Sequence, residues 1–426
     1  ASSEVFVSLK NFGIDSASII PCEIGRTVLP RFYTINVPFE QAQDVRDWVV
    51  SWQEVVCAEP NFAERANPCA AQNDPNDETY WCQWSAENTG DDYWWDPNPE
   101  EENIVVTGTP DCDIDAPEAW ALETGSSGVY VAVIDTGSDL DHPDLDGNIS
   151  VALAVDYWNG DYEPDDDNGH GTHIAGIIGA EGNSASGICG VDWDVSIIPI
   201  KVFSSTFTYR LNDLVNAINY LTTLRSTYSI NVRAINASWG IADSLAVSQA
   251  IYYAGQAGIL FVAAAGNGQV SPSYSGTDND TAAVYPACYT HENIIAVANT
   301  TDDDMLNSTS NYGASSVDLA APGTNIYSTW LSARLEYKTG TSMAAPHVAG
   351  VAALLAAQRP SLTAAEIKNL ILHTVNPLEH ANGLLGMVAT DGRLNAFEAV
   401  GGVHLATASE NDVIVASDGT IHVAYY

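Results

Sequence analysis

Five continuous apolar runs, separated by amphipathic stretches, constrain this chain more than any other feature. The runs are VYVAVIDTG, VSIIPIKVF, VRAINASWG, GILFVAAAGN and NIIAVAN. Such runs are typical of parallel strands that are buried on both faces of a sheet. Between them lie helical patterns such as LNDLVNAINYLTTL, in which apolar residues recur at helical spacing. The region from about 129 to 400 is therefore predicted to be a doubly wound α/β domain with a mostly parallel sheet.

The two ends of the chain carry different patterns. Residues 1–62 are interpreted as a small α+β unit, with strands over 4–10, 31–38 and 54–62, a turn after the first strand, and a helix over 39–52. The polar segment 63–73 has the composition of a linker, so the large domain is expected over 74–400. Residues 401–426 are interpreted as a short β tail.

The charge balance excludes several functions. The chain has 55 acidic and 14 basic residues, and its formal charge is −41. Nucleic acids and anionic membranes bind basic patches, so both are poor partners. The apolar runs are shorter than the roughly 20 residues that cross a bilayer, and no membrane span is predicted. The acids could form a solvated, halophile-type surface or could in part bind calcium.

The start of the chain and its cysteines bear on the compartment. A chain that begins at Ala1, without Met or an apolar leader, is expected for a secreted protein whose signal peptide has been removed. The cysteines show no zinc-site spacing and favour up to three disulfides, while buried thiols in a cytosolic protein are the alternative. The pair suggested first is Cys22 with Cys57, from the set Cys22, Cys57, Cys69, Cys82, Cys112, Cys189 and Cys288.

Glycosylation is a further expectation for a secreted chain. It is possible only in a suitable host, at sequons of the form N-x-S/T. The sequon asparagines are Asn148, Asn236, Asn279, Asn299 and Asn307.

Three residues at predicted strand ends and helix starts are candidates for a catalytic triad. A serine hydroxyl is a weak nucleophile that needs a histidine base, and the histidine needs an acid to fix its tautomer. Asp135 ends VAVIDTG, His170 opens the helix in NGHGTHIAG, and Ser342 lies in GTSMAAPHVAG. Taken alone, Ser342 is better explained as the cap of an Ala-rich helix.

These three blocks together resemble those of the subtilisin-like serine proteases, the subtilases, in that family's order of Asp, His and Ser. The resemblance implies a serine endopeptidase in which Ser342 attacks the scissile carbonyl, His170 takes and returns the proton, and Asp135 orients the imidazole. Asn267 in FVAAAGNG matches the side-chain donor to the oxyanion, and the Ser342 amide would be the second donor.

The resemblance also implies a cleft for polypeptide substrates. A substrate would add as a β-strand to INASWG, opposite a second wall in FVAAAGN, with an apolar residue at the base of the pocket. An apolar residue at the bottom of the pocket favours a substrate with a neutral or hydrophobic side chain on the residue before the cut. The implied residues are Ser238, Trp239, Gly240, Ala264, Ala265, Gly266 and Val284. Trp239 is equally well explained by packing in the core.

Two groups of residues are candidates for binding Ca²⁺. The segment DYWNGDYEPDDDNG could be only a solvated acidic loop, but its oxygens recur at intervals that suit calcium. It resembles the loop before the catalytic histidine of thermitase-like subtilases, with Asn159 replacing an acid. A dispersed second group matches the family's strong calcium site. The two sets are Asp156, Asn159, Asp161 and Asp165, and Asp74, Asp144 and Asn183.

Residues 1–62 resemble the propeptide of the same family. The resemblance implies a domain that assists folding, inhibits the enzyme and is then cut off within 63–73, so the chain's own propeptide is an expected partner. The acidic, aromatic segment 91–107 departs from the family pattern and receives no function.

Three functional hypotheses follow from these patterns. The leading one is a secreted, calcium-stabilised serine endopeptidase made as a zymogen. The alternatives are a subtilase scaffold kept as a structural or assembly subunit with the propeptide attached, and a processing protease that acts on one partner. The complete triad and Asn267 favour the first. The sequence leaves the oligomeric state open.

Overall fold

The computed structural model describes residues 75–90, 108–268, 275–377 and 386–401 in full, together with the backbone of further strands near both ends of the chain. The chain forms two compact units, which are described separately. One is Gln72–Gly401, and the other combines Ala1–Ala71 with Gly402–Tyr426.

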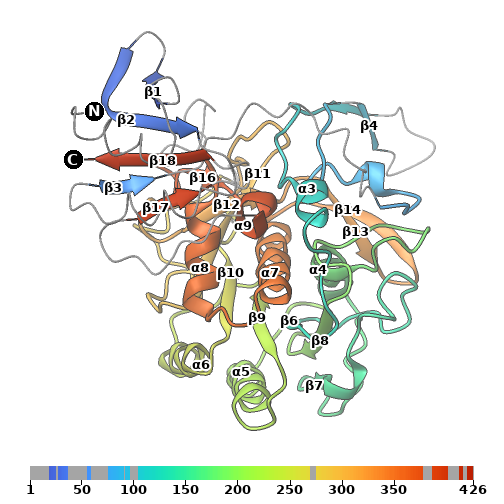
Figure 1. Ribbon diagram of the computed structural model, residues 1–426. Coiled ribbons are helices and arrows are strands. Elements are labelled where there is room, and N and C mark those ends of the chain that lie inside the picture. The colour runs from blue at the N-terminus through green and yellow to red at the C-terminus, as the bar shows by residue number, and fades with distance from the viewer. Residues whose placement is uncertain are drawn as a thin grey trace. The chain divides into compact units, whose positions relative to one another are not determined.

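The larger unit is built on a nine-stranded sheet with the order β15-β16-β12-β11-β10-β9-β6-β8-β7 (Figure 1). All neighbours are parallel except β15 and β16. The predicted doubly wound, mostly parallel sheet is confirmed. The five predicted apolar runs form β6 (Tyr130–Asp135), β8 (Ser196–Lys201), β9 (Val232–Ala237), β10 (Leu260–Ala264) and β11 (Ile294–Thr300). The remaining strands are β7 (Val155–Asp156), β12 (Leu319–Pro322), β15 (Asn376–Pro377) and β16 (Gly392–Arg393).

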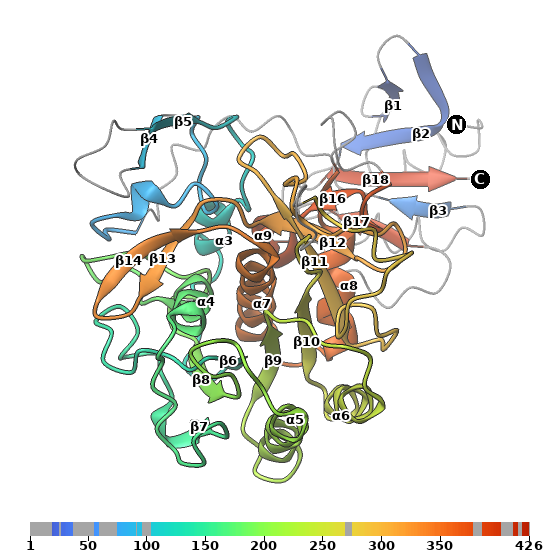
Figure 2. The ribbon, with the colours of Figure 1, turned by 180° about the vertical axis from the view of Figure 1, so that it is seen from behind.

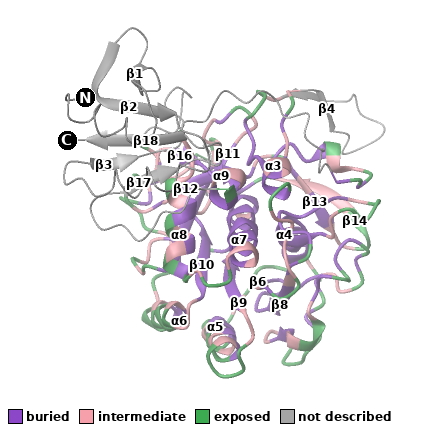
Figure 3. Cartoon of the chain, in the orientation of Figure 1, coloured by how far each residue is buried: buried purple, intermediate pink, exposed green. Residues whose placement is uncertain are grey.

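Helices cover both faces of this sheet, which explains why the runs are apolar without interruption (Figures 1 and 2). In β6, Val131 and Val133 pack into one core, whereas Ala132 and Ile134 pack into the other. The first core contains α3 (Ala116–Trp120), α4 (His170–Gly179), α7 (Thr341–Gln358), α8 (Ala364–His373) and α9 (Ala396–Gly401). The second contains α5 (Leu211–Ser226) and α6 (Leu245–Gln256). Figure 3 shows α7 almost wholly buried, whereas α5 and α6 expose one side.

The direction of winding reverses next to β6. From β6 the chain continues to β8 on one side and later returns to β9 on the other side. In open α/β sheets, ligands bind at the carboxyl ends of the strands beside such a reversal. Asp135 ends β6 and Ser238 directly follows β9, so both lie at the expected place.

Two hairpins and two short helical turns complete this unit. Strands β13 (Ile326–Trp330) and β14 (Arg334–Lys338) pair antiparallel, as do β4 (Asp92–Trp95) and β5 (Ile104–Thr107) within the 91–107 segment. The turns are η2 (Tyr80–Cys82) and η3 (Val151–Leu153). Within the described part of the chain, no helix is long and apolar enough to cross a bilayer.

The smaller unit contains a five-stranded sheet ordered β1-β2-β18-β17-β3. Its strands are β1 (Ile19–Ile24), β2 (Thr27–Asn36), β3 (Val55–Ala58), β17 (Asp412–Val415) and β18 (Thr420–Tyr425). Strand β1 falls where a turn was predicted, and the predicted elements over 4–10 and 39–52 lie outside the described residues. The segment interpreted as a separate tail supplies two strands that lie between β2 and β3 in the sheet.

Among the cysteines whose side chains the structure describes, the expected disulfides are not seen. Cys82, Cys112, Cys189 and Cys288 are free thiols, and burial raises the pKa of each. The suggested pairing of Cys22 with Cys57 does not fit the sheet, because β2 and β18 lie between β1 and β3. At about 4.8 Å per strand, these backbones are roughly 14 Å apart, beyond the reach of a disulfide. Cys69 lies outside the described residues.

Burial also narrows the expectation of glycosylation. Four of the sequon asparagines, Asn148, Asn236, Asn279 and Asn299, are buried, and in the first three the Nδ2 donates a hydrogen bond inside the fold. A glycan on Nδ2 would displace these bonds. Asn307 is partly exposed, but its Nδ2 also donates a hydrogen bond, to the Thr324 hydroxyl at 2.9 Å.

Candidate active site

Asp135 and His170 are held together at the carboxyl end of β6. Asp135 is fully buried, and its Oδ1 accepts a hydrogen bond from the Thr136 amide at 2.7 Å. The same oxygen lies 2.8 Å from Nδ1 of His170, the first residue of α4. The geometry is that of a histidine whose ring is oriented by an acid.

The environment of His170 favours its protonated form. Burial opposes protonation, but the negative charge of Asp135 and its hydrogen bond outweigh burial and raise the pKa of His170. Because Asp135 engages Nδ1, the second ring nitrogen is available to the cleft that His170 lines. The pair can therefore accept a proton from a group in that cleft and hold the resulting charge.

Ser342 is the second residue of α7 and does not cap it, because Gly340 occupies the N-cap position. The Ser342 hydroxyl donates to the Ser238 carbonyl at 3.2 Å, and the Ser238 hydroxyl donates to the Ser342 carbonyl at 2.8 Å. The interpretation of Ser342 as a helix cap is wrong at this position. In structures without substrate, the hydrogen bonds between catalytic groups are often long or poorly aligned, and they tighten when substrate binds. A rotation about χ1 would turn the Ser342 hydroxyl away from Ser238.

Asn267 lies beside the start of α7, and hydrogen bonds from Thr341 orient its side-chain amide. Its Oδ1 accepts hydrogen bonds from the amide and the hydroxyl of Thr341, at 3.0 and 3.4 Å. The Nδ2 group is thereby left as the donor. The Ser342 amide belongs to the first turn of α7, where amides lack helical partners and carry the positive end of the helix dipole. Two donors therefore lie at the start of α7, where Ser342 is the second residue.

One cleft of about 920 Å³ connects these residues. It is lined by His170, Ser342 and Asn267 and by six of the predicted substrate-binding residues, Ser238, Trp239, Gly240, Ala264, Gly266 and Val284. Val284 lies between the two walls, because a Cβ built on Gly240 or Gly266 would be 3.1 or 3.4 Å from its Cγ1. The expected position of Val284 at the base of a pocket agrees with this geometry.

Two of the predicted binding residues contribute differently from the others. Ala265 is buried in the core, and its carbonyl accepts hydrogen bonds from Asn279 and Asn311, so it supports the wall without lining it. The indole of Trp239 is also buried and donates to the Ile134 carbonyl at 2.8 Å. Its side chain therefore packs in the core, as the alternative interpretation held.

Several cleft residues were missed by the sequence analysis because no motif marks them. The ring of Phe207 lies edge-on to the ring of His170, with 4.8 Å between centroids, in the loop after β8. Tyr209 and Asn311 also line the cleft, as do Trp330 and Lys338 from the β13–β14 hairpin. The aromatic residues of SSTFTYR, which directly follow a predicted strand end, were the only signal for Phe207 and Tyr209.

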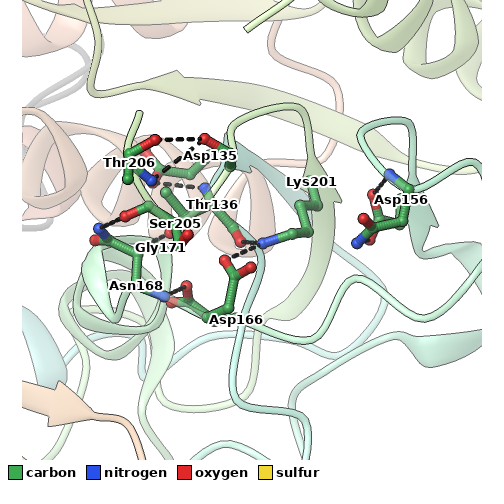
Figure 4. Close-up of polar contacts among 12 residues, drawn as sticks. Asp135, Thr136, Asp156, Asp166, Asn168, Gly171, Lys201, Ser205 and Thr206 are labelled. Carbon is green, nitrogen blue, oxygen red and sulfur yellow. Dashed lines mark hydrogen bonds and ion pairs between the residues drawn. The ribbon is translucent and has the colours of Figure 1, made fainter. Parts of the chain in front are cut away.

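Part of the acidic run before His170 has a structural role. Asp166 accepts hydrogen bonds from the amides of Gly169 and Thr172, which, against the effect of burial, lower the pKa of Asp166. Buried Lys201 donates to the Thr136 carbonyl, as Figure 4 shows, and to the Asp167 carboxylate at 2.6 Å. These contacts fix the loop that leads into α4.

The first predicted calcium set is only partly brought together. The Asp156 carboxylate accepts from the amide and the side chain of Asn159, both at 2.7 Å, and Asp161 pairs with Asp156 through its backbone. Asp165 is exposed and pairs instead with Ser138. Among the described residues, no three acidic, His or Cys side chains gather as a metal site.

The second set shows a different donor arrangement. Asp74 lies outside the described residues. Asp144 is buried and accepts from the Ile188 amide, while Asp77, which was not predicted, is buried and accepts from the amides of Asn183 and Ser184. Two buried carboxylates thus hold the 181–188 loop, a donor chemistry that fits a hard cation.

Comparisons with known proteins agree with this fold. Residues 126–401 match the model of the subtilase family. The chain is 40% identical over 283 residues to the thermophilic serine proteinase of Bacillus sp. (strain AK1), covering 66% of this chain and 64% of that protein. It is 38% identical over 287 residues to thermitase of Thermoactinomyces vulgaris, covering 67% of this chain and 93% of thermitase.

Solved structures are similar as well. A protease from Pseudoalteromonas arctica PAMC 21717 superposes with a TM-score of 0.62 at 26% identity, over 77% of this chain and 98% of that one. A cold-adapted subtilisin-like serine proteinase superposes with a TM-score of 0.53 at 30% identity, over 64% of this chain and 90% of that one. The chain therefore belongs to the subtilase family and is a subtilisin-like serine endopeptidase.

Proposed function

We propose that the protein is a secreted, calcium-stabilised endopeptidase, made as a zymogen, in which Ser342, His170 and Asp135 form the catalytic triad. The observation that carries this proposal is the 2.8 Å contact between His170 and Asp135 in the same cleft as Ser342. Ser342 Oγ attacks the scissile carbonyl while His170 accepts its proton, and His170 then returns the proton to the leaving amine. Asp135 stays ionised throughout and stabilises the imidazolium.

Asn267 and the Ser342 amide act on the oxyanion. Their N–H groups donate to the carbonyl oxygen as it gains negative charge, and they are in place before the reaction begins. Substrate adds as a strand along Ser238–Gly240, with the side chain before the cut directed toward Val284. The apolar base of this pocket favours a neutral or hydrophobic side chain.

Labelling by a fluorophosphonate tests the proposed nucleophile. We expect the wild type to react at Ser342 and to cleave casein, and Ser342→Ala to do neither while unfolding at the same temperature. A Ser150→Ala variant, altered outside the cleft, should be labelled like the wild type. Labelling of the Ser342→Ala variant at the wild-type rate would show that another residue is the nucleophile.

Calcium is proposed to stabilise the fold at the second set. Asp144, Asn183 and Asp77 would hold the ion with carbonyl groups of the 181–188 loop. Bound calcium would neutralise the two buried carboxylates and tie the start of the large unit to this loop. The first set, around Asp156 and Asp161, is a second and less complete candidate.

Chelation tests this part of the proposal. A ligand at 100 times its Kd stabilises a fold by about 2.7 kcal/mol, so EGTA should lower the Tm and added Ca²⁺ should restore it. Asp144→Asn should abolish most of this calcium-dependent shift, whereas Asp194→Asn, outside both sets, should keep it. Equal Tm values with EGTA and with Ca²⁺ would rule out a stabilising calcium site.

The zymogen proposal concerns residues 1–62 as an inhibitor and folding aid. Incubation of the full chain with Ca²⁺ should produce a cut within 63–73, and Ser342→Ala should stay intact. Processing of Ser342→Ala at the wild-type rate would exclude self-cleavage. A full chain that is labelled by fluorophosphonate but is never cut would instead favour the retained, structural role, which the shared sheet of β2 and β18 supports.

Secretion is the remaining part of the proposal. An antibody raised against residues 275–377 should detect the protein in the medium of its source cells. Detection inside the cells alone would contradict it.

A further inference from the structure

The cleft differs in charge from the rest of the molecule. The chain carries 55 acidic and 14 basic residues. Among the described residues that line the cleft, however, none is Asp or Glu, and Lys338 is the sole Lys or Arg. The cleft is thus an acid-free region with one fixed cation in an otherwise strongly acidic protein. Within the lining of this cleft, Lys338 is thus the group that can attract a negatively charged part of a substrate.

Lys338 is the last residue of β14 and is held by two contacts. Its Nζ lies 4.0 Å from the centroid of the Trp330 ring and 2.5 Å from a carboxylate oxygen of Glu336. The other oxygen of Glu336 lies 2.9 Å from Arg334. The hairpin therefore presents two cations to one anion and keeps a net positive charge. About a third of the Lys338 side chain, 34%, remains exposed.

Trp330, which contacts the Lys338 ammonium, packs against the start of α4. A Cβ built on Gly169 would lie 2.5 Å from atoms of the indole, so the ring packs directly on the backbone that precedes His170. The centroids of this ring and of the buried His173 ring are 6.2 Å apart, in an edge-to-face arrangement. The indole beneath Lys338 is therefore closely packed, and it lies against the residue that precedes His170.

The hairpin lies on the side of the site that faces the leaving group. In the proposed function, the acyl part of a substrate binds between Ser238–Gly240, which follows β9, and Ala264–Gly266, which starts at the last residue of β10. Figures 1 and 2 both show β13 and β14 beside α4, with β9 and β10 beyond it next to α7. His170 and Ser342, at the starts of α4 and α7, lie between these two regions. Residues after the scissile bond must therefore pass Trp330 and Lys338.

We propose that Lys338 is a specificity-determining residue that binds a side-chain carboxylate of the substrate, within the first two residues after the scissile bond. This inference rests on the proposed endopeptidase and adds its substrate class, peptides with Asp or Glu on the leaving-group side. The substrate carboxylate takes the place of Glu336 at the Lys338 ammonium, while Arg334 keeps Glu336 paired. The bonds that form and break at Ser342 are unchanged.

Matched peptides test this assignment. The substrates are internally quenched, C-terminally amidated peptides in two series. In one series only the first residue after the cut varies, and in the other only the second. The varied residue is Asp, Asn or Lys. The readout is the ratio of kcat/KM for Asp over Asn in the full chain after activation. Exposed and half-buried ion pairs are weak, so we expect a ratio of about 2 to 5 in the wild type at low salt. The ratio should fall as ionic strength rises.

Four variants separate the role of Lys338 from that of net charge. Lys338→Gln should bring the ratio close to 1, and Lys338→Arg should preserve it. Glu336→Gln should raise it, because this change frees the ammonium from its internal partner. Lys368→Gln removes the same charge on α8, outside the cleft, and should keep the wild-type ratio.

The outcomes distinguish a failure of the proposed role of Lys338 from a failure of the proposed endopeptidase function. A wild type that is labelled by fluorophosphonate and cleaves the Asp and Asn peptides equally leaves the endopeptidase standing and removes the role of Lys338. The same holds if Lys338→Gln keeps the preference or if Glu336→Gln lowers it. Should Lys338→Gln fail to fold, as shown by loss of labelling, the Glu336→Gln and Lys338→Arg ratios decide. A wild type that is neither labelled nor active overturns the endopeptidase, and this proposal with it.

Discussion

The buried carboxylate of Asp135 governs the charge of the catalytic histidine. One of its oxygens holds both the Thr136 amide and the His170 ring, while the other has no hydrogen-bond partner among the described residues. An ionised group in this position favours the imidazolium next to it. The carboxylate therefore acts on His170 in two ways, by orientation and by charge.

The pH dependence of activity follows from the raised pKa of His170. A base must be neutral, so kcat/KM should fall as the pH drops through a midpoint above the ordinary histidine value of about 6.5. In Asp135→Asn the charge is lost and burial dominates, so the midpoint should move to lower pH. The plateau of kcat/KM should fall about 10⁴-fold. Identical midpoints in the two pH profiles would refute this account of His170.

The amide of Asn267 provides a second prediction for a single residue. Asn267→Ala removes one donor to the oxyanion, which costs about 10²–10³ in kcat and leaves KM nearly unchanged. Asn219→Ala, on the exposed side of α5, is the matched control and should behave like the wild type. A tenfold or smaller loss of kcat would mean that the Ser342 amide suffices.

Among the elements, those with local signals were the ones that could be predicted. Strand β6 and helix α5 follow from runs and spacings within one segment, and the triad follows from blocks that end or open such elements. The β13–β14 hairpin carries no comparable signal, and the packing of Trp330 on Gly169 joins residues far apart in the chain. For the same reason the sequence could not reveal that β18 pairs with β2, or that Asp77 joins Asp144 at one loop.

Helix α7 shows how tightly the element that carries Ser342 is packed. A Cβ built on Gly350 would lie 2.6 Å from the Cβ of Val191, a distance that forces one of them to shift. Gly350→Ala should therefore lower the free energy of unfolding by about 1–3 kcal/mol, as overpacking of a core does. The measurement is urea unfolding followed by tryptophan fluorescence.

A double-mutant cycle provides the control for this packing. In the Gly350→Ala background, Val191→Ala removes the two methyl carbons that would lie 2.9 and 3.3 Å from the added Cβ but keeps the Cβ at 2.6 Å. It should therefore restore only part of the lost stability, whereas alone it should be destabilising. Additive losses in the double variant would show that the methyl groups of Val191 do not carry the strain.

At the scale of the whole molecule, three of the nine Lys and Arg residues that the structure describes are buried inside the fold. Lys201, Arg233 and Arg393 are buried, and Arg393 pairs with Asp304. The acids consequently dominate the surface of a chain with a formal charge of −41. Self-repulsion of this size opposes compactness unless it is screened.

Screening should therefore stabilise the protein. With Ca²⁺ in excess, the Tm should rise as NaCl increases from about 0.01 M to about 0.5 M, because the Debye length shortens from about 30 Å to below 10 Å. Differential scanning calorimetry measures the change, and sucrose at equal osmolality is the control for excluded solute. A constant or falling Tm would show that surface repulsion contributes little.

The position of β18 between β2 and β3 has a consequence for handling the protein. A cut in the 63–73 segment would separate β1, β2 and β3 covalently from the rest of the chain, but β18 would remain attached to α9 through residues 402–419. The two fragments would still share the backbone hydrogen bonds of one sheet. Processing would then give two bands on a denaturing gel and one peak in native chromatography, so band separation alone would not demonstrate release.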